Sequence, residues 1–96
     1  MNLKTALEAL HHTDYMVLHD YMREIAPRVE PSDDLIIFFN VSYEEDEIIV
    51  ELVNLYIAND DESESEIDEA RDRGYAEYDT SIEELTALLE EGEDHE

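Results

Sequence analysis

The chain has 96 residues and carries 29 Asp and Glu residues against 5 Lys and Arg, a formal net charge of −24 at pH 7. This charge disfavours nucleic acid and anionic membranes as ligands, because both repel it, and favours a positively charged partner. The absence of cysteine excludes disulfides, thiolate metal sites and a cysteine nucleophile. Because no window approaches the roughly 18 apolar residues of a membrane span, we expect a soluble cytoplasmic protein.

The apolar content predicts a folded chain despite the charge. Leu, Ile, Val and Phe account for 25 of the 96 residues, above the roughly 20% below which a strongly charged chain stays disordered. We expect one small α+β domain over residues 1–92, followed by a frayed acidic tail at 93–96.

The first segment is predicted to be helical. Its apolar residues recur at three-to-four spacing between Leu3 and Ile25, Asn2 suits the N-cap, and Pro27 closes the segment. The polar stretch 11–14 interrupts the apolar face and contains good capping residues. The pattern therefore leaves open one long helix or two short ones.

A β-hairpin is expected next. Residues 35–43 alternate apolar and polar side chains toward their end, which is typical of a strand buried mainly on one side. After the charged loop 44–47, the β-branched content of 48–57 favours a returning antiparallel strand. The same residues also satisfy helical spacing, with a capping-box match at 42–45, so a helix remains the alternative.

The last third is expected to be mainly helical. One helix begins at the S-x-x-E sequence that opens with Ser63 and ends before Gly74, and residues 75–78 form a third strand or a loop. A final helix opens at Ser81 and is closed by Gly92. Its apolar face consists of Ile82, Leu85, Leu88 and Leu89.

Catalytic and metal-binding signatures are missing from the sequence. It contains no G-x-S-x-G, no Gly-rich phosphate loop and no H-E-x-x-H, and the acidic stretch 60–69 lacks the glycine of a calcium-binding EF-hand loop. His11, His12 and His19 suggest exposed helix histidines before they suggest a zinc or nickel site, because no further ligand is placed by spacing. We expect neither an enzyme nor a bound cofactor or metal.

The charge is unevenly distributed along the chain. Residues 44–96 hold 22 carboxylates against Arg71 and Arg73, a formal charge of −20, whereas residues 1–43 carry −4. Asp60, Glu64, Asp68 and Asp72 recur every four residues, about 6 Å apart along a helix axis. Because each strand of duplex DNA presents a phosphate about every 3.4 Å, a folded surface can approach the charge density of a phosphate backbone.

The tyrosines divide into two groups. Tyr75 and Tyr78 have polar neighbours and suit a binding interface, whereas Tyr43 and Tyr56 are expected in the core. The predicted partner-binding residues are Glu44, Glu45, Asp46, Glu47, Asp60, Asp61, Glu62, Glu64, Glu66, Asp68, Glu69, Asp72, Tyr75, Glu77, Tyr78 and Asp79.

In size, acidity and clustered Asp and Glu, as in 44–47 and 60–69, the chain resembles the small phage proteins that inhibit restriction enzymes, CRISPR effectors and other DNA-binding machinery. Those proteins share no common motif, so the resemblance is one of physical type. It implies a nucleic-acid mimic that blocks the basic groove of a DNA- or RNA-binding protein, in the cytoplasm of the host cell if a phage encodes it. The alternatives are a halophilic acidic domain and an acidic adaptor or chaperone for a basic protein.

We predict that neutral salt stabilises the fold. At a net charge of −24, compaction brings like charges together, and salt screens their repulsion. The melting temperature should rise when sodium chloride is increased from about one-tenth molar, where the Debye length is about 10 Å, to about 1 M. A melting temperature that falls over this range would contradict the prediction.

Overall fold

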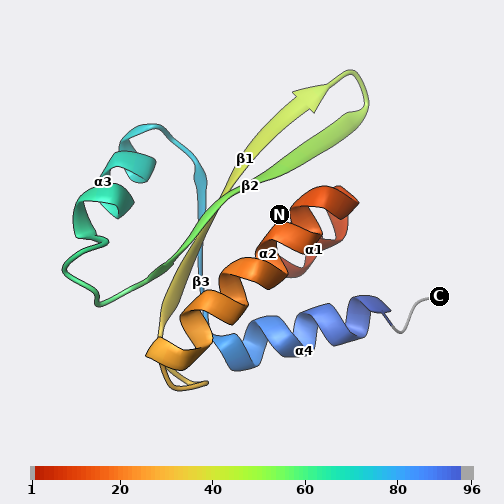
Figure 1. The fold of residues 1–96 in the computed structure, drawn as a ribbon. Helices are drawn as coiled ribbons and strands as arrows, with labels where there is room; N and C mark the ends of the chain where they lie inside the picture. The colour runs from red at the N-terminus through yellow and green to blue at the C-terminus, as the bar shows by residue number, and fades with distance from the viewer. Residues whose placement is uncertain (1, 94–96) are drawn as a thin grey trace.

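The computed structural model describes the backbone of residues 2–93 and the side chains of residues 2–90. Its elements follow an α+β order, with N-terminal helices, a three-stranded antiparallel sheet and C-terminal helices (Figure 1). They are α1 (Leu3–Ala9), α2 (His12–Ile25), the 3₁₀ turn η1 (Ala26–Arg28), β1 (Leu35–Glu44), β2 (Glu47–Ile57), α3 (Glu64–Asp72), β3 (Ala76–Thr80) and α4 (Ile82–Glu93).

The sheet resolves two of the three ambiguities that the sequence left open. Its strand order is β2-β1-β3, with β1 antiparallel to both neighbours. Residues 47–57 are a strand and not a helix, and a third strand forms at 76–80. A hairpin alone is marginally stable in water, so the third strand and the covering helices supply the burial that β1 and β2 need.

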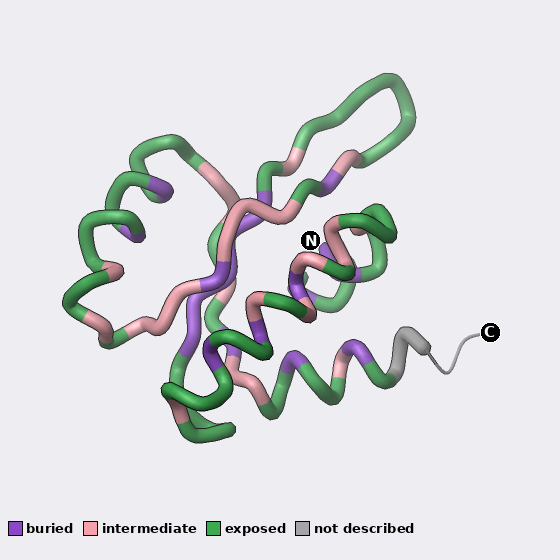
Figure 2. Tube along the Cα trace, in the orientation of Figure 1, coloured by how far each residue is buried: buried purple, intermediate pink, exposed green. Residues whose placement is uncertain are grey.

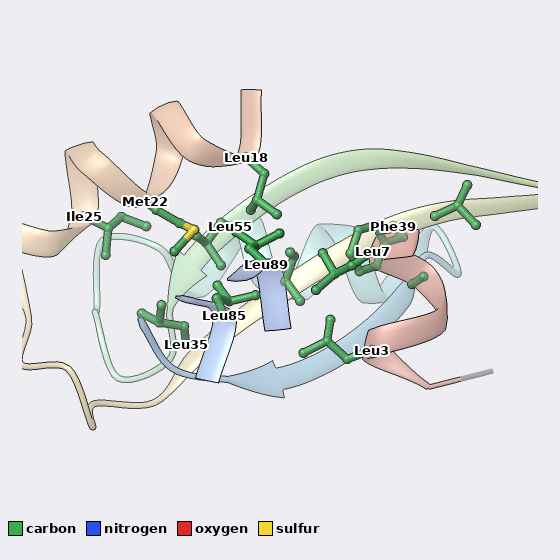
Figure 3. Packing of buried hydrophobic residues seen from close by; sticks show 13 residues of the cluster. Leu3, Leu7, Leu18, Met22, Ile25, Leu35, Phe39, Leu55, Leu85 and Leu89 are labelled. Atoms are coloured by element: carbon green, nitrogen blue, oxygen red, sulfur yellow. The ribbon is translucent and has the colours of Figure 1, made fainter. Parts of the chain in front are cut away.

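Strand β1 is buried on both faces, which corrects the expectation of a strand buried mainly on one side. Leu35, Ile37 and Phe39 pack into the larger core under α1, α2 and α4 (Figure 3). The alternate residues, Ile36 and Phe38, pack under α3. Because neighbouring strand residues point to opposite faces, two separate helical layers are required to cover five consecutive apolar side chains.

The N-terminal segment forms two helices. Asn2 caps α1 as predicted, its side-chain oxygen accepting a hydrogen bond from the Thr5 backbone N–H at 2.9 Å. Leu10 leaves the helix and forms a parallel bridge with Val50 of β2. In α2, Asp14 accepts a hydrogen bond from the Leu52 backbone N–H at 3.3 Å. Both contacts occupy the outer edge of β2.

The downstream helix boundaries are predicted only in part. Gly74, at φ +78°, follows α3 as expected, because this left-handed conformation is easiest for glycine. The predicted capping box does not form: the Ser63 side chain accepts no hydrogen bond from the helix backbone, and its hydroxyl donates to Asp60 at 3.3 Å. Helix α4 runs past Gly92 to Glu93, so Gly92 does not close it. The rest of the predicted tail, 94–96, lies outside the described residues.

The β1–β2 hairpin extends beyond the rest of the sheet. Strand β3 pairs with β1 only over residues 35–39, and the hairpin continues from there as a two-stranded arm that ends in the 44–47 turn (Figure 1). At about 3.4 Å per residue, the five steps from residue 39 to residue 44 carry the arm roughly 17 Å past β3.

None of the described helices could cross a membrane. The longest, α2, has 14 residues, and its apolar side chains Leu18, Met22 and Ile25 are committed to the core.

We predict that Ile67→Ala destabilises the protein by about 2–4 kcal/mol, because this side chain is buried between α3 and the sheet and its loss leaves a cavity. Urea unfolding measures the effect without adding salt. Met16→Ala is the control, since Met16 is half exposed on α2 and should change stability by no more than about 0.5 kcal/mol. A loss below about 0.5 kcal/mol for Ile67→Ala would contradict the packing of α3.

Candidate partner-binding surface

The strand register places carboxylates from all three strands on the α3 side of the sheet. Residues paired across strands share a face, and Ile36 and Phe38, which face α3, are paired with Asp79 and Glu77 of β3. Farther along the same face of the hairpin, Glu44 is paired with Glu47, and Asn40 with Glu51. The five strand carboxylates on this face are Glu44, Glu47, Glu51, Glu77 and Asp79, and all are exposed.

The segment 61–72 adds a second row of exposed carboxylates on this side. Glu64, Asp68 and Asp72 recur along α3 at the predicted four-residue interval, about 6 Å per step. Together with the five strand carboxylates they form what we call the acidic face. Most of α3 and the turn before it is exposed (Figure 2). The exposed members of the acidic face from this segment are Asp61, Glu62, Glu64, Glu66, Asp68, Glu69 and Asp72.

Asp60 differs from the rest of the predicted acidic row because its carboxylate is bound by other groups of the same chain. Its carboxylate accepts hydrogen bonds from the Glu62 backbone N–H at 3.3 Å and from the Ser63 hydroxyl at 3.3 Å. Arg28 approaches it at 3.4 Å, and only 21% of the side chain is exposed. Asp60 therefore orders the turn before α3.

The two arginines of the acidic half are both paired within it. Arg71 donates two hydrogen bonds to the Glu77 carboxylate, at 2.7 and 2.8 Å, and so joins α3 to β3. These hydrogen bonds lower the pKa of Glu77 and raise that of Arg71. Arg73 donates to Glu69 at 2.9 Å, and hydrogen bonds to Tyr75 and Glu69 raise the pKa of Arg73. Most carboxylates of the acidic face thus have no cation to neutralise them.

A groove of about 340 Å³ lies between the start of α3 and the end of the sheet. Ile36, Ala58 and Ile67 supply its apolar surface, and its carboxylates are those of Asp60, Asp61, Glu64 and Asp68. Arg71 also lines the groove, and its guanidinium is held by the Glu77 carboxylate. A lysine or arginine side chain has a matching division between an apolar stem and a charged head. The groove can accept such a side chain from a partner.

Helix α4 lies on the opposite side of the sheet from α3 (Figure 1). Its exposed carboxylates Glu83, Glu84 and Glu90 therefore stand apart from the acidic face. The structure thus divides the carboxylates of residues 44–96 between two sides of the sheet.

The predicted interface tyrosines also lie on different sides. Tyr75 is half-buried against the small core under α3, beside the acidic face. Tyr78 points into the larger core, where its ring meets Phe39 edge to face at a centroid distance of 5.8 Å. Tyr56 is partly buried beside Phe38 as expected, and burial raises its pKa.

The expectation that Tyr43 lies in the core is wrong. Its residue is 72% exposed at the end of the hairpin, and its strand partner Ile48 is 47% exposed. The core helices do not reach this far, because α1 ends at Ala9 and Leu10 contacts the arm at Val50. Strand alternation alone carries no information on where the covering helix stops, so the sequence had no signal for this exposure.

In the part of the chain that the structure describes, no group of three or more His, Asp or Glu side chains is arranged to hold a metal ion. The His19 ring instead meets the Tyr15 ring edge to face, with centroids 4.9 Å apart. This contact suits a histidine that packs along a helix.

Comparison with known proteins adds no relative. No family model, curated protein or solved structure matches this chain. The functional argument therefore depends on the charge and shape of the surface.

We predict that the Glu77 carboxyl titrates below the ordinary glutamate range and returns toward it in Arg71→Gln. The contribution of this pair to stability is present above the unfolded-state pKa and is lost as the pH falls through the lowered folded-state pKa. NMR titration of the side-chain carboxyl carbon measures the pKa. The Arg73→Gln variant is the control, because Arg73 pairs with Glu69 and should leave Glu77 unchanged. An ordinary pKa for Glu77 in the wild type would contradict the pairing.

Proposed function

We propose that this protein is a non-enzymatic inhibitor whose acidic face imitates a nucleic-acid phosphate backbone and occupies the basic groove of a DNA- or RNA-binding protein, such as a CRISPR or restriction effector. The observation that carries the proposal is the collection of strand and α3 carboxylates on one side of the sheet, with Arg71 and Arg73 paired locally. Ordinary solvated surfaces mix both signs of charge.

The spacing of these charges suits a groove built for phosphates. Carboxylates recur about every 6 Å along α3, and Glu77 and Asp79 of β3 stand one alternate position apart, about 6.6 Å along the strand. The longest extent of the molecule is 39 Å, which at 3.4 Å per step limits the mimic to roughly eleven phosphates of each strand.

Binding would draw on the interactions that a nucleic acid uses. Lysines and arginines already arranged for phosphates would accept carboxylates, and the counterions held at both surfaces would be released. The groove beside α3 gives one such side chain an apolar surface for its stem and the carboxylates of Asp61, Glu64 and Asp68 for its head. The complex needs no cofactor and should weaken steeply with salt.

The uneven distribution of charge supports mimicry over a halophilic surface. An acidic coat that keeps a protein hydrated in salt should surround the whole surface. In this chain the acidic charge is one-sided, because the cations Lys4, Arg23 and Arg28 belong to the N-terminal part, on the other side of the sheet or beside its end. An acidic adaptor for a basic protein makes the same electrostatic demands as a mimic. Competition with DNA separates these two functions.

The test is capture from a cell lysate at low salt on the immobilised chain, followed by elution with duplex DNA or with polyglutamate at equal charge. We expect DNA to release a nucleic-acid-binding protein, identified by mass spectrometry, at concentrations where polyglutamate does not. Basic proteins that both polymers release equally would favour the adaptor. If no basic protein is retained and the chain unfolds below molar salt, the halophilic reading is favoured.

Charge-neutral variants locate the surface. Glu64→Gln with Asp68→Asn and Asp72→Asn removes three charges from the acidic face, and we expect capture to be lost at a lower salt concentration than for the wild type. The matched control is Glu8→Gln with Glu83→Gln and Glu90→Gln, which removes the same charge from exposed positions on the other side. Equal weakening by both triples would show that total charge matters and its location does not.

A further inference from the structure

The end of the β1–β2 arm presents an apolar surface in the most acidic part of the chain. Tyr43 and Ile48 are cross-strand partners, so their side chains adjoin on one face of the arm. Among the described residues, they and Met16 are the exposed large apolar side chains. Tyrosine is enriched at binding hot spots, because it buries a large apolar area and keeps a polar group.

This apolar pair adjoins the turn 44–47, in which all four residues carry carboxylates. By strand alternation the pair lies on the face of the arm opposite to Glu44 and Glu47. Glu45 adopts φ +53°, a left-handed conformation that glycine, asparagine or aspartate would adopt more easily. Position 45 of the turn thus holds a glutamate, although glycine would adopt this backbone conformation more easily. The end of the arm therefore offers an apolar pair on one face and carboxylates on the other face and in the turn, and a recess that encloses the tip would meet both.

The charge of the turn selects the occupant. A second copy of this chain would bring two rows of glutamates together, which costs free energy because like charges repel. A basic protein with an apolar recess among its lysines and arginines matches both parts of the surface. Charge complementarity therefore favours a basic protein over self-association.

We propose that the hairpin tip, residues 43–48, is an anchor that inserts the Tyr43–Ile48 pair into an apolar recess of the basic partner, while Glu44–Glu47 pair with the cations around it. This inference rests on the proposed function and assigns to the same complex a contact that a phosphate backbone does not make. The acidic face supplies attraction at long range, and the tip supplies a short-range contact that salt does not screen.

The experiment places a photoreactive benzoylphenylalanine at position 48 in one variant and, as a matched control, at position 16 in another. Met16 is similarly exposed but lies on α2. Each immobilised variant is illuminated in lysate at low salt, with and without duplex DNA. We expect position 48 to crosslink to a nucleic-acid-binding protein at an apolar residue near Lys or Arg, and we expect DNA to prevent it. Position 16 should give no such product.

An affinity comparison accompanies the crosslinking. The double variant Tyr43→Ser with Ile48→Ser keeps every charge, and it should release the captured protein at a DNA concentration at least about tenfold lower than the wild type, as for loss of a hot spot. Met16→Ser should behave as the wild type. Circular dichroism checks that both variants remain folded.

The outcomes separate the two proposals. If DNA-displaceable capture persists but position 48 crosslinks no more than position 16, the anchor is refuted and mimicry stands. A crosslink from position 48 to a second copy of this chain would also overturn the anchor, because the tip would then serve self-association. If the wild type captures nothing that DNA displaces, the proposed function fails and the anchor fails with it.

Discussion

The two-sided burial of β1 is the constraint on which the rest of the structure depends. Its residues 35–39 are five consecutive apolar side chains that are almost completely buried. A strand sends alternate side chains to opposite faces, so neither face can be left to water. The N-terminal helices and α4 cover one face and α3 covers the other. In a chain of 96 residues, this arrangement commits most of the apolar side chains to two cores on either side of one strand.

The same alternation decides where the charges go. Once Ile36 and Phe38 face α3, the carboxylates paired with them across the sheet must face that side too. The exposed surface of α3 then extends the row. Concentrating like charges in this way opposes folding, and the hydrogen bonds between Arg71 and Glu77 offset part of the cost where α3 meets β3. The one-sided charge distribution that suggests mimicry thus results from two causes. Core packing fixes which strand side chains face α3, and Asp and Glu occupy strand positions that point to that side.

Local patterns predicted much of this fold, and tertiary contacts account for what they missed. Composition and periodicity predicted the α+β class, the Asn2 cap, the first strand and the helix after Ser63, because each depends on neighbouring residues. Whether 48–57 is a strand depends on pairing with β1, and the break at Leu10 depends on its bridge to Val50. The candidate residues were found by composition, but their division between two sides required the register. Glu51 on the acidic face and the exposure of Tyr43 both follow from contacts between residues distant in sequence.

The most direct test of the central claim, that the acidic face and the hairpin tip form the binding surface, is an amide NMR footprint of the labelled chain bound to the nucleic-acid-binding protein that DNA displaces from it. The account predicts that signals from 43–51, 61–72 and 77–79 shift or broaden on binding. Signals from the outer surfaces of α2 and α4 should stay in place. A footprint centred on α4 or spread evenly over the molecule would contradict the account, because binding would then depend on the net charge and not on the face that the sheet assembles.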